Sequence, residues 1–367
     1  MGVLHPKPPM HDKVDMTPKD VEQSKQNDSP QKFLKAIKSS KSILIIMDSR
    51  FDYDALCSVL AFSEALKQLK IAHRCVYGYK IPSKPKEYFD TKRIEEHVDL
   101  KTLDYSPYDL IVFLDSGTLE HHTKAADFTA PKGLTTLNID HHLGNTMYGT
   151  LNYVLPRAST GSVLYDLFNA WDVIVSPIIV DYILATILTD TGLLQLDNVT
   201  PLELRTIAQL TEKGGRYNDF IRFLTSNESR DELIVKGILY SNLKVDTKKR
   251  FAYSTLLKEE ADAKNVTERG TISADTIKNL RGMDFVFILE TDVSFPKHWR
   301  VSLRSHNMDF DVLKIAQHFG GGGHKVAAGC SIQFSQAKTV EDVVEKIWQV
   351  AKTTAKQNSF KTPSAQD

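Results

Sequence analysis

Three short apolar runs in this chain end directly in acidic residues, and this pattern restricts the fold more than any other feature. The runs are 43–47, 110–114 and 134–139, and the residues that follow them are Asp48, Asp115 and Asp140. Runs of this length are typical of strands buried on both faces of a parallel sheet. Because such sheets bind ligands at the carboxyl ends of their strands, the acidic residues are expected to meet at one edge.

Helical segments fill the gaps between these runs. Apolar side chains recur at helical spacing in residues 55–69 and 179–187. The alternation of strand and helix predicts an α/β fold whose first domain is a doubly wound, mostly parallel sheet covered by helices. A smaller α/β domain with a mixed sheet is expected after it. Its expected strands lie at 250–257, 285–289, 300–303 and 330–334, and its expected helices lie near 273–281, 310–318 and 339–351.

The overall charge argues against one class of partner. Lys plus Arg and Asp plus Glu both number 46 in 367 residues, so there is no excess of positive charge to attract a long nucleic acid. A short, locally recognised substrate is compatible with this balance. No apolar stretch is long enough for a signal peptide or a membrane span, and the expected location is the cytoplasm, without membrane contact. The sequence leaves the oligomeric state open and allows a homodimer.

The first strand end carries three carboxylates. Asp48, Asp52 and Asp54 stand where the strand gives way to a helix that begins near Ala55. Unpaired carboxylates this close together would repel one another, and a divalent cation would remove that repulsion. The alternative is structural, since Asp52 or Asp54 can cap the helix.

Later segments add the other components of a metal site. Asp115 precedes a turn, and Asp140 is followed by His141 and His142. Because neighbouring side chains of a strand point to opposite sides, the two histidines are expected to differ in role: one binds metal, and the other faces substrate and manages a proton. Asp190 ends an apolar helix, where a negative charge opposes the helix dipole and requires a compensating cation.

A glycine run in the second domain suits an anion. Four glycines precede His324, so backbone N–H groups can approach phosphate closely, and a helix beginning near His324 would direct its positive end there. Arg304 can form paired hydrogen bonds with phosphate. A bare glycine run is often only a flexible turn, but His324 and the Ala-Ala-Gly sequence at 327–329 make this pattern specific.

Taken in order, these motifs resemble those of the DHH phosphoesterase superfamily, and within it the NrnA-like group of nanoRNases and 3′-phosphoadenosine 5′-phosphate (pAp) phosphatases. The resemblance spans roughly residues 40–350. The matching motifs are Asp52-x-Asp54, Asp115, Asp140-His141-His142, Thr189-Asp190-Thr191-Gly192, the glycine run 320–324 and Ala327-Ala328-Gly329. The expected parts are a disordered polar tail (1–30), a DHH catalytic domain (31–215), a helical linker (216–247), a DHH-associated substrate-binding domain (248–352) and a second disordered tail (353–367).

The resemblance implies two divalent metal ions, Mn²⁺ in first place and Mg²⁺ as the alternative. One ion would be held by Asp48, Asp52 and Asp115. The other would be held by Asp54, Asp115, His141 and Asp190, so that Asp115 forms the bridge. His142 would face the phosphate and assist proton movement. Asp140 would either ligate metal weakly or orient His141.

The resemblance also implies a substrate class. Short single-stranded oligonucleotides would be hydrolysed from an end, pAp would be converted to AMP, or both. The residues that would grip the terminal nucleotide are Ser302, Arg304, Ser305, Gly321, Gly322, Gly323 and His324. Two alternatives stay open: hydrolysis of cyclic dinucleotides such as cyclic di-AMP, and a nucleotide-binding protein with weakened catalysis.

The first motif departs from the family pattern. Position 48 is Asp where the family usually has His, and Arg50-Phe51 replace the usual Asn-Pro. Because a carboxylate can ligate a hard divalent ion, a two-metal site is expected to persist, with its preference shifted toward Mg²⁺. The same change is the basis of the binding-protein alternative.

Overall fold

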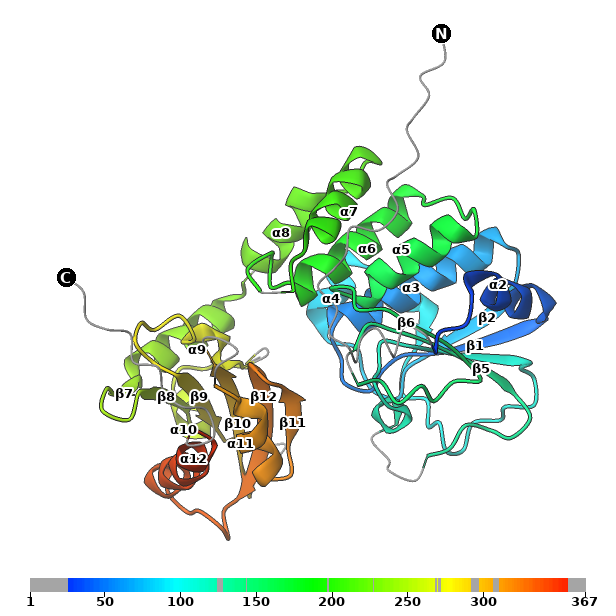
Figure 1. Cartoon of the computed structure of the whole chain (residues 1–367). Helices are drawn as coiled ribbons and strands as arrows, with labels where there is room; N and C mark the ends of the chain where they lie inside the picture. Colours follow the sequence, from blue (N-terminus) through cyan, green and yellow to red (C-terminus); the bar gives the residue numbers. More distant parts are fainter. Residues whose placement is uncertain are drawn as a thin grey trace. The chain divides into compact units, whose positions relative to one another are not determined.

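The chain forms two compact units that divide after Ser226 (Figure 1). The computed structural model describes residues 26–123, 128–142, 144–196, 198–226, 228–267, 269, 272–291, 297–305 and 310–355. The helical stretch expected at 216–247 divides between the units, because α8 (Tyr217–Ser226) belongs to the first and α9 (Arg230–Ser241) to the second. The expected tails lie outside the described residues up to residue 25 and from residue 356.

The first unit is built on a six-stranded sheet in which all neighbouring strands are parallel, in the order β3-β2-β1-β4-β5-β6. The strands are β1 (Ser42–Ile46), β2 (Ala72–Val76), β3 (Ile94–Glu95), β4 (Leu110–Leu114), β5 (Thr135–Asp140) and β6 (Leu151–Val154). The predicted α/β class with a parallel sheet is confirmed, although the short strands β3 and β6 were not predicted. The order reverses between β1 and β4, the position at which such sheets bind ligands.

Helices cover one face of this sheet, and irregular segments cover the other. The helices are α2 (Pro30–Ser39), α3 (Tyr53–Gln68), α4 (Ser83–Tyr88), α5 (Thr160–Ala170), α6 (Pro177–Asp190), α7 (Pro201–Glu212) and α8. Among the described residues, α3, α5 and α6 share a core with Ile45 and Val112. The opposite face, including Leu44 and Phe113, packs against Leu100 and Tyr108 from outside any helix. One-sided helical cover leaves the carboxyl edge of the sheet beside α3, α5 and α6.

Capping residues fix where the helices next to this edge begin. The Asp52 side chain accepts a hydrogen bond from the backbone N–H of Ala55 at 2.8 Å and caps α3. Ser159 caps α5 in the same way, accepting from Ser162 N–H. Side chains of this type satisfy the first N–H groups of a helix, which otherwise lack partners. The helix starts, and with them the first-turn residues, are therefore set by the local sequence.

Residues just before α2 bond to the outer strand β6. Asp28 N–H donates to the Asn152 carbonyl at 2.8 Å, and Asn152 N–H donates to Asp28 Oδ2 at 3.0 Å. The Asn27 amide makes a similar pair of bonds with the backbone of Val154, both at 2.7 Å. The sequence assigned residues up to 30 to a disordered tail. Residues 27–29 instead lie bonded to β6 or capping α2, because their short polar side chains match free backbone groups.

The second unit contains a mixed six-stranded sheet in the order β11-β12-β10-β9-β8-β7, with β8 and β9 parallel and the other neighbours antiparallel. The strands are β7 (Lys244–Asp246), β8 (Phe251–Leu256), β9 (Phe285–Glu290), β10 (His298–Ser305), β11 (Gly322–His324) and β12 (Ala327–Gln333). The helices are α9, α10 (Lys258–Ala263), α11 (Val312–His318) and α12 (Val340–Ala355). Apolar residues of α9 and α10 pack on one face, and those of α11 and α12 on the other.

Two predicted helices of this unit were wrong. No helix begins near His324, because residues 322–324 form β11, which pairs with β12. Near 273–281 the chain forms only a short 3₁₀ helix, η3 (Ala274–Thr276), capped by Ser273. Among the described residues of both units, no helix is both long enough and apolar enough to cross a membrane.

Candidate active site

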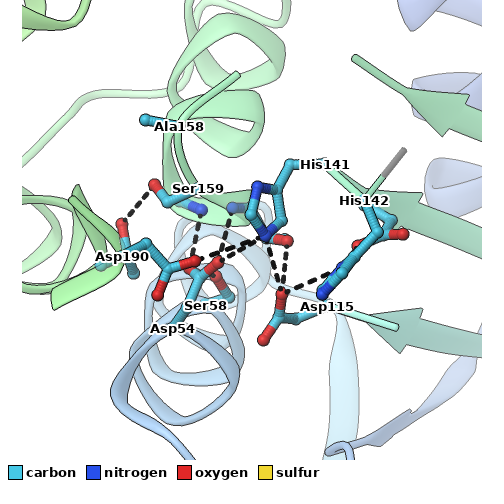
Figure 2. A network of polar contacts seen from close by, with 12 residues as sticks. Asp54, Ser58, Asp115, His141, His142, Ala158, Ser159 and Asp190 are labelled. Carbon is cyan, nitrogen blue, oxygen red and sulfur yellow. Dashed lines mark hydrogen bonds and ion pairs between the residues drawn. The ribbon is translucent and has the colours of Figure 1, made fainter. Parts of the chain in front are cut away.

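Acidic and imidazole side chains from separate elements meet at the carboxyl edge of the first sheet (Figure 2). Asp115 follows β4, Asp54 lies in the first turn of α3, and Asp190 is the last residue of α6. Asp54 and Asp115 are almost fully buried, with 0% and 3% of their surface exposed. His141, just past β5, points its ring among these three carboxylates (Figure 2).

His141 presents a lone pair to the acidic cluster. Its Nδ1 lies 3.2 Å from the Arg157 carbonyl, which can only accept, so Nδ1 carries the proton and donates. Nε2 is therefore the unprotonated nitrogen. It lies 3.4 Å from Asp190 Oδ2, 3.6 Å from Asp115 Oδ1 and 3.7 Å from Asp54 Oδ2, and it is buried without a hydrogen-bond partner. A buried acceptor that faces three carboxylates is an arrangement that a cation between them would stabilise.

The donor set fits a divalent metal ion. Among the residues that the structure describes, two groups of side chains have donor atoms within 4.8 Å of one another: Asp54, His141 and Asp190, and Asp115, Asp140, His141 and His142. Carboxylate oxygen with one imidazole nitrogen suits Mg²⁺, Mn²⁺ or Zn²⁺. Burial, followed by repulsion from Asp54 and Asp52, raises the pKa of Asp190 well above its ordinary value, and the pKa of Asp115 is raised for the same reasons. A bound cation would relieve this repulsion.

The backbone at Asp115 is strained. Its φ is 63°, in the left-handed region that non-glycine residues rarely adopt and that Asp and Asn tolerate best. Its Oδ1 accepts a hydrogen bond from the Thr160 hydroxyl at 2.9 Å. Strain of this kind persists only where the surrounding structure holds it, and it concentrates at functional sites.

Asp140 binds His142 and not His141. Its Oδ1 lies 2.7 Å from His142 Nδ1, and its Oδ2 accepts from the Asn145 amide at 2.6 Å. The expectation that Asp140 orients His141 was therefore wrong, because the Arg157 carbonyl performs that task. Burial tends to lower the pKa of His142, but the hydrogen bond and the charge of Asp140 outweigh it and raise that pKa. Burial opposes the shift at Asp140 as well, yet its bond to His142 lowers the pKa of Asp140.

These shifts predict how the Asp140–His142 pair titrates in metal-free protein. Because the pKa of His142 is raised on folding, its contribution to stability is complete below about pH 6.5 and is lost as the pH rises through the raised value. Because the pKa of Asp140 is lowered, its contribution is complete above about pH 4 and is lost as the pH falls through the lowered value. Asp140→Asn should lower the pKa of His142 in an ¹H–¹⁵N NMR titration of the imidazole nitrogens. An unchanged pKa would show that the Asp140 contact does not set it.

One segment that leads into the first turn of α5 contacts three of the four clustered residues, and sequence reasoning missed it. Arg157 O bonds His141, the backbone N–H groups of Thr160 and Gly161 donate to Asp54 at 2.7 and 3.2 Å, and the Thr160 hydroxyl bonds Asp115. The signal was present as the run of small residues Ser159-Thr160-Gly161-Ser162, which forms the N-cap and the first turn of α5. We call residues 157–161 the support segment.

A buried ion pair anchors the support segment. The Arg157 side chain is 6% exposed and its Nε donates to Glu203 Oε1 at 2.7 Å, while the Glu203 side chain is 1% exposed. The same carboxylate accepts from the Ala158 backbone N–H at 3.1 Å and from the Ser162 hydroxyl at 2.7 Å. Glu203, on α7, thereby holds the first two residues of the support segment and the residue that follows it.

Asp48 and Asp52 have other partners. Asp48 is buried, and its carboxylate is bonded to Arg50. Asp52 is exposed and caps α3, which is the role expected for it from the sequence as the alternative to metal binding. Within the described part of the chain, neither residue belongs to a group whose donor atoms could share one ion.

The expected nucleotide-binding residues of the second unit lie side by side in its sheet. Ser302 pairs with Gly329 and Arg304 with Ala327 across β10 and β12, and the same two β12 residues pair with Gly322 and His324 of β11. The Arg304 guanidinium donates to Asp275 Oδ2 at 2.8 Å and to Ser273 Oγ at 2.9 Å. Ser302 Oγ accepts from Ala274 N–H, and Ser305 is buried with its N–H bonded to the Val326 carbonyl. The His324 side chain lies outside the described residues.

Close packing requires two residues of the glycine run. A Cβ at Gly321 would lie 2.2 Å from the Gly329 carbonyl oxygen, and one at Gly323 would lie 2.5 Å from that of Ala327. Gly323 also has a φ of 135°. Gly322 has open space around it. The run is thus an edge strand that lies tightly against β12, and its backbone takes part in the sheet.

Comparisons with known proteins agree with this arrangement. Residues 42–189 match the DHH family, N-terminal domain, and residues 248–353 match the DHHA1 domain. The chain is 26% identical over 244 residues to the bifunctional oligoribonuclease and PAP phosphatase NrnA of Bacillus subtilis, covering 64% of this chain and 74% of the relative. It is 29% identical over 206 residues to NrnA of Thermus thermophilus, covering 54% and 58%.

One further relative and one solved structure align over most of the chain. The probable bifunctional oligoribonuclease and PAP phosphatase NrnA of Streptococcus mutans is 25% identical over 332 residues, covering 86% of this chain and 96% of the relative. The crystal structure of an exopolyphosphatase-related protein from Bacteroides fragilis has the same fold, with a TM-score of 0.79 at 22% identity over 90% of this chain and 97% of that one. The two matched domains together span more than half of the sequence, and the chain belongs to the DHH family of phosphoesterases, hydrolases that act on phosphoester bonds.

Proposed function

We propose that this chain is a divalent-metal-dependent hydrolase of short oligonucleotides, which it degrades from an end, and of pAp, with Mn²⁺ as its preferred ion. The observation that carries the metal dependence is His141 Nε2, buried without a partner among three carboxylates. The substrate class follows from relatives named as oligoribonucleases and PAP phosphatases.

The residues around the cluster have distinct roles in this proposal. Asp54, Asp115, His141 and Asp190 hold the ion, which supplies positive charge to polarise phosphate and to acidify water. His142 faces the phosphate through the ring edge that Asp140 does not bind. Its Nδ1 contact with the Asp140 carboxylate favours the imidazolium form, which stabilises negative charge and can deliver a proton to the leaving oxygen.

The second unit supplies nucleotide recognition in the same proposal. Arg304, with Ser302, Ser305, Gly321, Gly322, Gly323 and His324, binds the terminal nucleotide. Arg304 is preorganised for phosphate, because Asp275 and Ser273 hold its guanidinium in place. The pKa of Asp275 falls to about 2: burial opposes the shift, but the charge of Arg304 dominates, so this pair stays ionised across the neutral range.

Product analysis tests this function. Purified protein is offered a 5′-labelled dinucleotide, pAp and cyclic di-AMP side by side, with Mn²⁺, with Mg²⁺ and with EDTA. We expect mononucleotide from the dinucleotide and AMP from pAp, and no product in EDTA. Because the Asp48 carboxylate is bonded to Arg50, the shift toward Mg²⁺ expected from an extra Asp48 ligand should not occur, and turnover should be greater in Mn²⁺. Cleavage of cyclic di-AMP alone would replace the proposal with a cyclic-dinucleotide phosphodiesterase. Nucleotide binding without turnover in either ion would make the chain a binding protein.

A further inference from the structure

The two sides of the acidic cluster differ in how their charge is compensated. On one side, Asp54, Asp115 and Asp190 surround His141 Nε2, and within the described residues none of them is paired with Lys or Arg. On the other side, Asp48 is paired with Arg50. A divalent ion fits the first side, where Asp54, His141 and Asp190 have donor atoms within 4.8 Å of one another and Asp115 Oδ1 lies 3.6 Å from the same His141 nitrogen. The second side already holds a cation, the Arg50 guanidinium.

The Asp48–Arg50 contact uses both carboxylate oxygens. Oδ1 accepts from the Arg50 backbone N–H at 2.6 Å and from its Nε at 3.2 Å, and Oδ2 accepts from Nη2 at 3.0 Å. The Asp48 side chain is only 2% exposed, so the guanidinium binds a desolvated carboxylate in fork geometry. To ligate a metal ion, Asp48 would have to break these contacts and bring a second positive charge beside Arg50.

The charge of Arg50 acts on the same carboxylates that the family pattern would assign to this second ion. Burial opposes the shift, but the bond to Asp48 and the charges of Asp48, Asp115 and Asp52 raise the pKa of Arg50. Asp52 also directs Oδ1 to the Ala55 N–H at the start of α3. The family's usual His and Asn at positions 48 and 50 are replaced together, by a carboxylate and the cation that pairs with it.

We propose that this chain binds one divalent ion per active site, at Asp54, Asp115, His141 and Asp190, and that the Arg50 guanidinium takes the place of the second cation. The Arg50 side chain is 43% exposed, and its N–H groups that Asp48 does not use are available to a phosphate oxygen. This inference rests on the proposed function, because a cation in that place matters only if phosphate binds there.

Metal stoichiometry tests the inference directly. Mn²⁺ bound per chain is measured by equilibrium dialysis with elemental analysis, and electron paramagnetic resonance distinguishes isolated ions from exchange-coupled pairs. The wild type should hold about one ion with an isolated signal, whereas the double variant Asp48→His/Arg50→Asn should hold about two with a coupled signal. The matched control is Asp284→His/Arg250→Asn, which makes the same substitutions in an Arg–Asp pair of the second unit and should leave the value unchanged.

Single variants guard against misfolding of the double variant. Arg50→Lys keeps the positive charge and should stay at about one ion, while Arg50→Met frees Asp48 and should gain a second ion, with the fold of each confirmed by circular dichroism. Two coupled ions in a wild type that hydrolyses its substrates would overturn this inference alone. One ion without any hydrolysis would overturn the proposed function alone, and no bound ion would overturn both. A double variant that folds and still holds one ion would remove Arg50 from this role.

Discussion

Asp115→Asn is expected to lower kcat/KM for phosphoester hydrolysis by about 10³-fold or more while making the metal-free protein more stable. Asp115 contributes a carboxylate 3.6 Å from His141 Nε2, and an amide cannot replace its negative charge in binding a divalent ion. In metal-free protein the same charge is unfavourable, because burial and the neighbouring carboxylates raise its pKa well above the ordinary value. Removing it relieves repulsion within the fold.

Asparagine is the informative replacement at this position. It tolerates the left-handed backbone at φ 63° about as well as Asp does, and its carbonyl can still accept from Thr160, so neither strain nor a lost bond confuses the result. Activity, Mn²⁺ affinity and the melting temperature in EDTA are measured together. Asp172→Asn, at an exposed position with a similar left-handed backbone (φ 55°), is the control and should change none of them. Unaltered activity in Asp115→Asn would make the residue a turn former only.

Of the substitutions proposed here, Glu203→Ala should cause the largest loss of stability, about 3 kcal/mol in the free energy of unfolding. It removes the more deeply buried of the two carboxylates that bind the Arg157 guanidinium, so that Asp166 alone is left to compensate this charge, and it leaves the Ala158 N–H unbonded. Since Glu203 also anchors the support segment, Mn²⁺ affinity should fall about tenfold even though Glu203 does not contact the metal cluster.

Chemical denaturation and metal titration separate these two effects. Glu212→Ala, at the exposed end of the same helix α7, should leave both values within error and serves as the control. If Glu203→Ala lost stability but kept full metal affinity under conditions where it is folded, the support segment would hold its shape without α7. An unchanged stability would mean that water or Asp166 compensates Arg157 fully.

The sequence predicted the elements that depend on side-chain pattern. The apolar runs at 43–47, 110–114 and 134–139 correspond to β1, β4 and β5 within a residue or two, because strands buried on both faces are marked by continuous apolar character. Because the ends of these apolar runs are clear in the sequence, the acidic residues that follow them could be placed at the carboxyl edge of the sheet. The strands β3 and β6 were not, since two to four residues of mixed polarity give no periodic signal.

Contacts made by backbone atoms explain much of what the sequence did not predict. The Arg157 carbonyl and the N–H groups of Thr160 and Gly161 orient the cluster, and every residue has such groups, so composition cannot mark them. The glycine run was interpreted as the start of a helix, whereas it is a strand whose glycines allow β11 to lie against β12. The pairing of Arg50 with Asp48 could have been predicted from the sequence, because the residues at both positions differ from those usual in the family and carry opposite charges.

The bonds from Asn27 and Asp28 limit how the first sheet can grow. An outer strand normally offers its backbone groups to a strand of another molecule, which leads to sheet extension or aggregation. Here the outward N–H and C=O groups of Asn152 and Val154 are already bonded to these two residues without a further strand being added. Any self-association through β6 would first have to break the hydrogen bonds of Asn27 and Asp28, so contacts between copies of the chain are directed to other surfaces.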